Sequence, residues 1–99
     1  MGIQRYVKAP VERKRYLIRY VEWLDTGELV SSVVFTPAPV SAQNDPLVID
    51  GIGITPEATA VQYYASGGVV GVTYRVLVVM TTAGGQVRED VVLFSIREP

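Results

Sequence analysis

The last third of the chain carries the clearest alternation of apolar and mixed positions. Between Val72 and Met80 every even-numbered residue is apolar or aromatic, and a second alternating run covers residues 87–97. Alternation with a period of two predicts β-strands that each have one buried face. The segment between the runs, TTAGGQ, is rich in residues that form tight turns. The two runs therefore predict a β-hairpin.

The register of this hairpin follows from its buried faces. A slip of one residue exchanges the two faces of a strand, so the loop must have an odd number of residues if the apolar faces are to lie together. A three-residue loop over Ala83, Gly84 and Gly85 meets this condition, with Gly85 in the left-handed conformation. In that register Tyr74 faces Phe94 and Val76 faces Val92.

The rest of the chain shows further short strands separated by turn residues. Strands are predicted over residues 16–24, 29–35, 47–54 and 59–65. The glycines inside 47–54 predict a bulge or a bend, and the run TPAPVSAQND at 36–45 predicts a loop or a crossing between sheets. No window shows the 3.6-residue period of a helix. Six or seven short strands over residues 15–99 favour an all-β fold, an antiparallel immunoglobulin-like β-sandwich.

Composition narrows the chemistry that the chain can perform. It has no cysteine and no histidine, which excludes thiolate nucleophiles, histidine-based triads and the usual zinc sites. Asp45, Asp50 and Glu57 are the candidates for a carboxylate pair or a calcium site, but their spacing matches no ligand pattern. We therefore expect a non-enzymatic protein with no catalytic residue, no metal and no cofactor.

The chain is also apolar for its size. Hydrophobic residues make up 48% of it and its mean hydropathy is +0.25. No run is long enough to cross a membrane and no signal peptide is present, so no membrane contact is expected. The hairpin register places four residues together on the face opposite the core: Leu77, Val79, Val91 and Leu93. This patch is either a contact surface for a neighbouring subunit or a surface that sheet twist or another strand of the chain covers.

Charge is distributed unevenly along the chain. Residues 1–15 hold five basic residues against one acid, whereas the remainder holds four arginines against nine acids. This predicts an extended basic N-terminal arm over residues 1–14, followed by the sandwich domain over 15–99. The arm either docks on an acidic partner or is simply solvated. Its basic cluster is short and is not interleaved with aromatic residues that could stack on bases, so no nucleic acid partner is expected. Its candidate docking residues are Lys8, Arg13, Lys14 and Arg15.

The stretch SGGVVGVTY at residues 66–74 has three glycines followed at once by a strand. A phosphate-binding loop is one interpretation, but it needs a lysine and a hydroxyl residue after the glycines or a helix behind them, and neither is present. The second interpretation is a sharp turn that needs positive φ at one or more of Gly67, Gly68 and Gly71. Tyr74 would then bury its ring and bond its hydroxyl to the turn backbone, the tyrosine corner of immunoglobulin-like sandwiches.

The residues of this corner belong to a longer pattern that extends over nearly the whole chain. It comprises Lys8-x-Pro10, Tyr16, Tyr20-x-x-Trp23-Leu24, Leu29-x-Ser31-Ser32, Ser66-Gly67-Gly68, Gly71, Tyr74-x-Val76, Thr81-Thr82 and Gly84. The order and spacing resemble those of the bacteriophage fibre-to-tail adaptor proteins, a family of small virion proteins. The chain departs from that family at Ala9, Val11 and Arg15, near which its members carry acids, and at Val34 or Phe35, where they commonly have tryptophan.

The resemblance implies an immunoglobulin-like, non-enzymatic structural protein in the tail or neck of the virion, assembled in the host cytoplasm. Its implied partners are other tail or neck proteins and the fibres, with copies of the chain in a ring. The basic charge of the N-terminal segment implies that the surface it contacts is acidic. The alternative function is a capsid decoration or carbohydrate-binding adhesion module that uses exposed loops and aromatic residues such as Trp23, Tyr63 and Tyr64.

Overall fold

The two alternating runs at the end of the chain pair with each other at the centre of the larger of two sheets. In this computed structural model, which describes residues 3–39 and 47–98, there are seven strands and no helix. The strands are β1 Ile3–Lys8, β2 Lys14–Arg19, β3 Val30–Pro39, β4 Leu47–Ile54, β5 Ala60–Gly67, β6 Thr73–Thr82 and β7 Val87–Ile96. The all-β prediction is confirmed.

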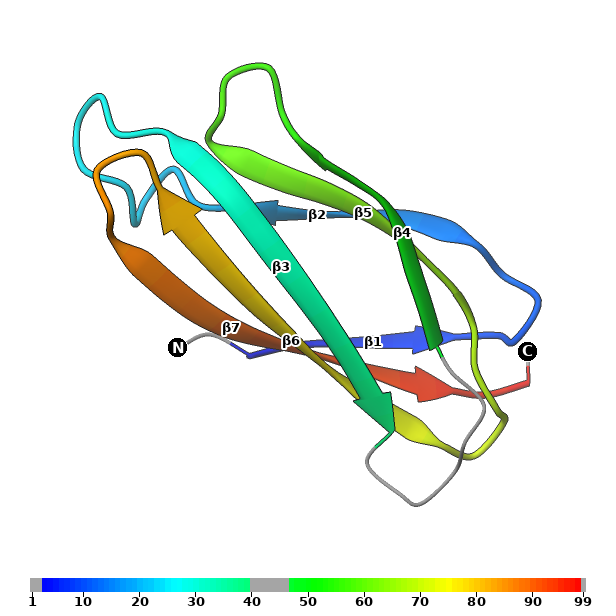
Figure 1. Ribbon diagram of the computed structural model, residues 1–99. Coiled ribbons are helices and arrows are strands. Elements are labelled where there is room, and N and C mark those ends of the chain that lie inside the picture. The colour runs from blue at the N-terminus through cyan, green and yellow to red at the C-terminus, as the bar shows by residue number, and fades with distance from the viewer. Residues whose placement is uncertain (1–2, 40–46, 99) are drawn as a thin grey trace.

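The strands form two sheets that pack as a sandwich (Figure 1). The four-stranded sheet has the order β1-β7-β6-β3, and the three-stranded sheet has the order β2-β5-β4. All paired strands are antiparallel except β1 and β7, which run parallel. The chain changes sheet between β1 and β2, between β2 and β3, between β3 and β4, and between β5 and β6, as it does in immunoglobulin-like sandwiches. The predicted fold is confirmed.

The hairpin of β6 and β7 has the register that alternation predicts. Tyr74 lies opposite Phe94 and Val76 lies opposite Val92. The loop closes with a hydrogen bond of 2.8 Å from the Thr82 N–H to the Gln86 carbonyl, and Gly85 has a φ of +90°. An L-amino acid with a side chain strains the backbone there, which explains why the loop needs a glycine.

Strand β1 is the element that the sequence pattern did not predict. It lies along β7, with Ile3 opposite Val91 and Lys8 opposite Ile96. Of its inward positions only Tyr6 is aromatic or apolar, because Gln4 and Lys8 occupy the other two, so alternation does not reveal the strand. The sequence predicted an extended basic arm over residues 1–14, but residues 3–8 of this segment form an edge strand of the four-stranded sheet.

Two other strands end at different places from those predicted. β2 ends at Arg19 because the chain turns at Tyr20, whose carbonyl accepts hydrogen bonds of 2.9 Å from two later N–H groups. β3 continues through residues expected to form a loop, as far as Pro39. It is an edge strand, and proline is tolerated where one side of a strand has no neighbour. Residues 40–45 of the expected crossing lie outside the described residues.

The predicted irregularity in the glycine-containing strand is confirmed. The register of β4 against β5 shifts between Asp50 and Gly53, and Gly51 adopts a φ of +58°. A Cβ atom at Gly51 would lie 2.6 Å from the Tyr64 ring, so glycine is required both for the backbone conformation and for the close approach.

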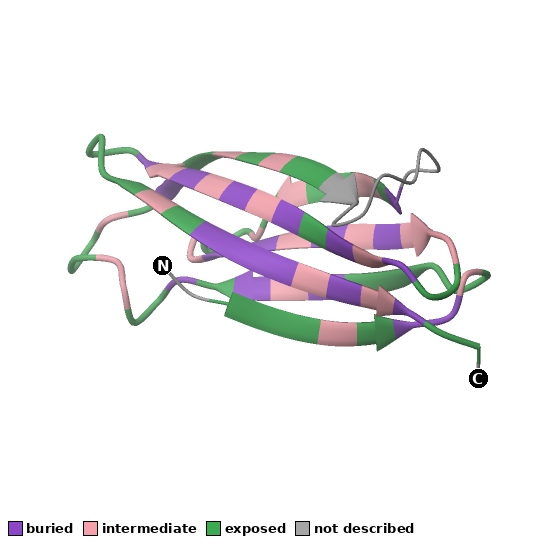
Figure 2. Ribbon diagram, turned by 90° about the horizontal axis from the view of Figure 1, so that it is seen from below, coloured by how far each residue is buried: buried purple, intermediate pink, exposed green. Residues whose placement is uncertain are grey.

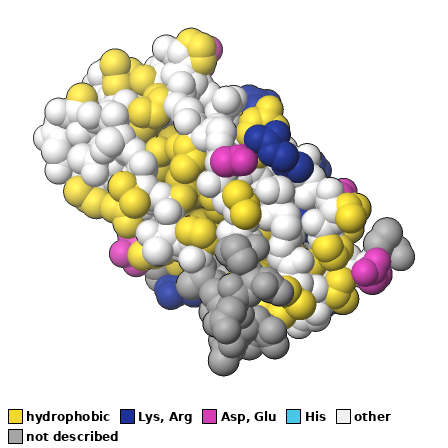
Figure 3. All heavy atoms as spheres, turned by 45° about the vertical axis from the view of Figure 1, so that its right-hand side comes forward, with side chains coloured by type: hydrophobic (Ala, Val, Ile, Leu, Met, Phe, Trp, Pro, Cys, Tyr) yellow, Lys and Arg dark blue, Asp and Glu magenta, His cyan; other side chains and the backbone are white. Residues whose placement is uncertain are grey.

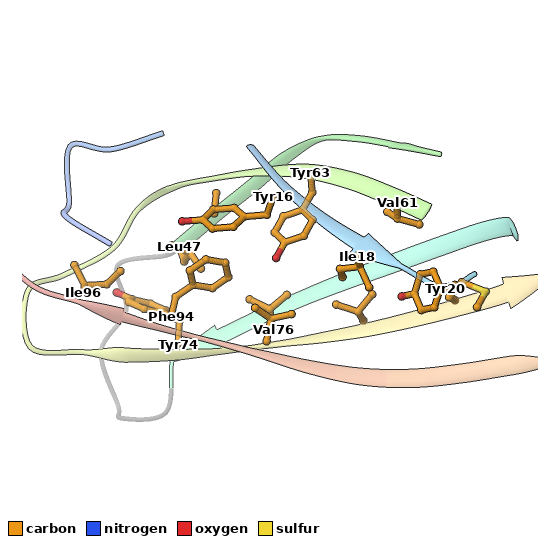
Figure 4. Close-up of a cluster of buried hydrophobic side chains, with 14 of the residues drawn as sticks. Tyr16, Ile18, Tyr20, Leu47, Val61, Tyr63, Tyr74, Val76, Phe94 and Ile96 are labelled. Carbon is orange, nitrogen blue, oxygen red and sulfur yellow. The ribbon is translucent and has the colours of Figure 1, made fainter. Parts of the chain in front are cut away.

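Burial alternates along the strands, which Figure 2 shows as changes of colour from one residue to the next. The buried faces meet in a core that contains an aromatic cluster. The Tyr16 ring stacks on Tyr63 with 5.5 Å between centroids, and it meets the edge of Phe94 at 5.1 Å. Figure 4 shows these rings between the two sheets, with Tyr74 beside Phe94 and Tyr20 at the opposite end of the core. Such ring contacts add to the free energy of burying the rings' area.

Candidate functional site

The glycine-rich stretch forms the connection between β5 and β6. Gly67, Gly68 and Gly71 all have positive φ, of +76°, +97° and +86°. Tyr74 is completely buried, and its hydroxyl accepts a hydrogen bond of 3.0 Å from the Val69 N–H. This is the geometry of a tyrosine corner, in which a buried ring fixes the backbone of the preceding turn. The glycines therefore shape the turn.

Lys8 is part of the same end of the sandwich. Its side chain is buried, and its Nζ donates hydrogen bonds of 2.7 Å to the carbonyls of Ala9 and Gly67. Burial lowers the pKa of the Lys8 amine, and the nearby Glu12 carboxylate opposes this shift. Because a residue that is 1% exposed has no surface to offer, the prediction that Lys8 contacts a partner is corrected: it ties the end of β1 to the β5–β6 turn.

The hydrophobic patch predicted from the hairpin register lies on the outer surface of the four-stranded sheet. Leu77, Val79 and Leu93 are half-buried there, whereas Val91 is only 4% exposed and is covered by the chain's own side chains. Burial within the chain was the second of the two interpretations of this patch, and it holds for Val91.

Strands on both sides of the hairpin extend this patch. Val34 of β3 pairs with Val79 and is 60% exposed. At the other side of the sheet Ile3 pairs with Val91, and Val7 is 66% exposed. We call the resulting surface the apolar face; it comprises Ile3, Val7, Val34, Leu77, Val79 and Leu93. Figure 3 shows apolar side chains gathered on one side of the molecule, with a group of basic and acidic side chains beside them.

The remaining basic residues lie on the other side of the sandwich. Arg15 pairs with Tyr64 on the outer surface of the three-stranded sheet, and its Nε donates to the Gln62 side chain at 3.0 Å. The Arg13 guanidinium lies 4.1 Å from the centre of the Tyr64 ring and forms a 2.9 Å ion pair with Asp50. The candidate docking residues of the basic segment therefore do not lie together, because Arg13 and Arg15 are on this surface whereas Lys8 is buried.

Lys14 stands at the rim of this surface. It is exposed, and its Nζ lies 5.8 Å from the centre of the Tyr16 ring. Together Arg13, Lys14 and Arg15 therefore form an exposed basic region at the start of β2, separate from the apolar face. They are available to an acidic partner, whereas Lys8 is not.

A groove that the sequence did not indicate opens on one side of the sandwich, between the end of β2 and strands β1 and β7. Its volume is about 410 Å³, and Ile18, Tyr20 and Trp23 line one wall. Arg88 and Asp90 line the opposite wall, where Arg88 Nε lies 3.1 Å from both Asp90 oxygens. The groove has the size of small ligand sites, but it is open along its side.

Asp90 is the least expected residue of the groove. It is 6% exposed, and its ion pair with Arg88 compensates for the burial of its charge. Burial raises the pKa of the neighbouring Tyr20 hydroxyl, and the Asp90 carboxylate raises it further. The sequence did contain a signal, because Asp90 shares the inward parity of Val92 and Phe94.

The structure also gives the positions of the residues considered for carbohydrate binding and for a metal site. Tyr63 is fully buried, so the prediction that it forms part of a carbohydrate-binding surface is wrong; Tyr64 is half-buried beneath Arg13. Asp50 is paired with Arg13, and Asp45 lies outside the described residues. Across residues 3–39 and 47–98, no group of three or more acidic side chains gathers as a metal site. The same residues contain no helix with the length and apolarity of a membrane span.

The chain was compared with curated proteins and with models of protein families. No curated protein matches the chain. A family model described as "Podophage GP4 fiber-tail adaptor protein gp77" matches residues 8–95, which include Lys8 of β1, all of β2 to β6, and β7 except Ile96. The matched region contains the tyrosine corner, the buried Lys8 and the basic region at the start of β2. It also contains the apolar face except for Ile3 and Val7 of β1. The chain therefore belongs to the podophage GP4 fibre–tail adaptor (gp77) family.

Proposed function

We propose that this protein is a non-enzymatic structural component of a phage virion, located in the tail or neck region, where it joins tail components to fibres. Membership of the fibre–tail adaptor family supports the adaptor role. Under this proposal the protein is incorporated as virions assemble in the host cytoplasm, and it acts by binding its neighbours with two different surfaces.

The apolar face is the observation that carries the proposal. It crosses the four-stranded sheet from β3 to β1, and at its two sides Val34 and Val7 remain 60% and 66% exposed. Exposed apolar side chains gathered on one face of a domain mark a place where another molecule binds. The face therefore fits a neighbouring virion protein.

Two arginines indicate the charge of this partner. Arg5 and Arg75 are exposed, and both pair with Leu93 in the sheet, one from each side. Within the described part of the chain neither guanidinium has an ion-pair partner. Arginine among apolar side chains is the composition of interface centres, so the proposed partner surface is apolar and carries carboxylates.

The arrangement of the surfaces also supports a ring of copies. The apolar face and the basic region at the start of β2 lie on opposite sides of the sandwich. Contacts between two different surfaces repeat from copy to copy and close into a ring when the rotation between copies allows it.

Matched substitutions on the two outer surfaces test the proposal. Val34→Glu places a charge in the apolar face, whereas Val48→Glu places the same charge at a 43% exposed site on β4, in the other sheet. Both variants should fold like the wild type, because both sites are exposed. We expect Val34→Glu to be lost from purified particles and Val48→Glu to be incorporated, with both measured by quantitative mass spectrometry.

Two results would overturn the proposal. Equal incorporation of both variants would show that the apolar face makes no contact in the particle. Particles that lack the protein but keep their fibres, combined with rapid proteolysis of the protein on intact virions, would favour a decoration module instead. Deletion of residues 1–14 is not a suitable test, because it removes β1 together with the basic residues.

A further inference from the structure

The four edge strands of the sandwich differ in how well they resist pairing with another chain. β3 carries Pro37 and Pro39, and β4 contains the bulge at Gly51. Both features discourage an added strand, as they do at the edges of many natural sheets. The other two edge strands, β1 and β2, contain neither a proline nor a bulge. They are therefore the edges at which an additional strand can form.

The backbone of β2 has groups available for such pairing. The Tyr20 N–H donates to the Thr59 carbonyl at 2.9 Å, on the side of β2 that faces β5. Because backbone groups alternate sides along a strand, the N–H and C=O groups of Arg15, Leu17 and Arg19 point away from β5, toward the free edge. Over the described residues no other backbone group bonds to them.

The groove provides the space that an added strand needs. A strand placed beside β2 would send alternate side chains into the region between the sheets. The cavity of about 410 Å³ lies there, next to Ile18 and Tyr20 of the β2 side and Val92 of β7. Apolar side chains of the added strand would fit this position without displacing the core.

The outward-facing side chains of β2 indicate which charge the added strand should carry. Arg15 and Arg19 are exposed on the outer surface, on either side of Leu17. Arg19 has no ion-pair partner among the described residues, and Arg15 bonds only to the neutral Gln62 side chain. Residues directly opposite each other on neighbouring strands interact, and opposite charges there are favourable.

We infer that the free edge of β2 accepts an extended segment of a neighbouring virion protein as an additional strand. The segment carries carboxylates opposite Arg15 and Arg19 and apolar side chains that enter the groove. Main-chain hydrogen bonds supply much of the affinity, and the alternating side chains supply the specificity. This inference rests on the proposed virion function and names the surface that holds one of the protein's partners there.

Hydrogen–deuterium exchange on intact particles tests the inference directly. In the isolated protein the amides of Leu17 and Arg19 face solvent, so they exchange rapidly. We expect them to exchange at least about tenfold more slowly in particles. Equal exchange rates in particles and in the isolated protein would overturn the inference. Absence of the protein from particles would instead refute the proposed function, so the two failures are distinguishable.

A pair of substitutions at one position provides the second test. Leu17→Pro and Leu17→Ala both remove the leucine side chain, but only proline also removes the outward N–H. Since that N–H does not bond to β5, both variants should fold, and thermal melting of each checks this. We expect incorporation of Leu17→Pro into particles to fall about tenfold below that of Leu17→Ala. Equal incorporation of two folded variants would contradict strand addition at β2, and if Leu17→Pro does not fold, the exchange measurement on the wild type decides.

Discussion

The hydroxyl of Tyr74 accepts a hydrogen bond from the backbone N–H of Val69, 3.0 Å away, at the point where the chain passes from one sheet to the other. The ring itself is fully buried in the core. One side chain thus connects the packing of the sandwich to the shape of the β5–β6 turn. The stability of the turn and that of the core should therefore change together.

Replacement of Tyr74 by phenylalanine tests this connection. The Tyr74→Phe variant keeps the ring but leaves the partly buried Val69 N–H without its acceptor. Loss of one partner of such a bond costs about 1–3 kcal/mol. We expect the free energy of unfolding, measured with urea, to fall by about this amount. A variant as stable as the wild type would show that the bond contributes nothing.

The glycines of the same turn should differ in their tolerance of alanine. Gly68 has positive φ, and a Cβ there would lie 2.8 Å from Ile96 Cγ1, whereas a Cβ at Gly71 would meet open space. Gly71→Ala therefore suffers only backbone strain, about 1–2 kcal/mol. Gly68→Ala suffers the same strain plus a steric overlap with a buried side chain, about 1–3 kcal/mol more. Equal melting temperatures for the two variants would contradict this difference.

Tyr63 should determine part of the response to alkaline pH. Its hydroxyl is buried and has no hydrogen-bond partner among the described residues. Burial raises the pKa of Tyr63, and nearby tyrosines raise it further. In the unfolded chain the phenol loses its proton near pH 10, whereas in the folded protein it keeps it to higher pH. Protons are then bound more tightly by the folded state, so stability falls as pH rises above about 10.

The Tyr63→Phe variant separates the two consequences of this burial. At neutral pH it removes an unsatisfied hydroxyl, so the free energy of unfolding should be unchanged or about 1 kcal/mol higher. Above about pH 10 the decline in stability should be less steep than in the wild type, by up to about 1.4 kcal/mol per pH unit. Urea titrations at several pH values measure both effects. Identical slopes for the two proteins would contradict the burial of the ionisable group.

The hairpin and the bulge are predictable from the sequence because each depends on a local pattern of residues. Along β6 and β7 the alternation leaves one register that keeps the apolar faces together, and Gly85 supplies the only tight loop compatible with it. Within residues 47–54 two glycines interrupt a strand, which predicts a bulge or a bend. The tyrosine corner is anticipated for the same reason, since glycines at positive φ precede a buried tyrosine.

The interaction surfaces are less predictable because they depend on contacts between distant segments. Lys8 and Arg13 are close in sequence, but one is buried against Gly67 and the other stacks on Tyr64 at the surface. Gln4 and Lys8 occupy inward positions of β1 and leave it almost no apolar period. Neither the strand nor its contribution to the apolar face is therefore visible in the sequence. The groove arises only where the ends of three strands meet.

A cryo-electron microscopy map of the particle tests the central claim, that the protein joins virion components through its apolar face. We predict density for the protein between tail and fibre, with the surface over Val34, Leu77 and Leu93 pressed against a neighbouring molecule. The neighbour should present apolar side chains and carboxylates toward Arg5 and Arg75. A map in which this surface faces solvent, or in which the protein lies on the capsid, would contradict the account.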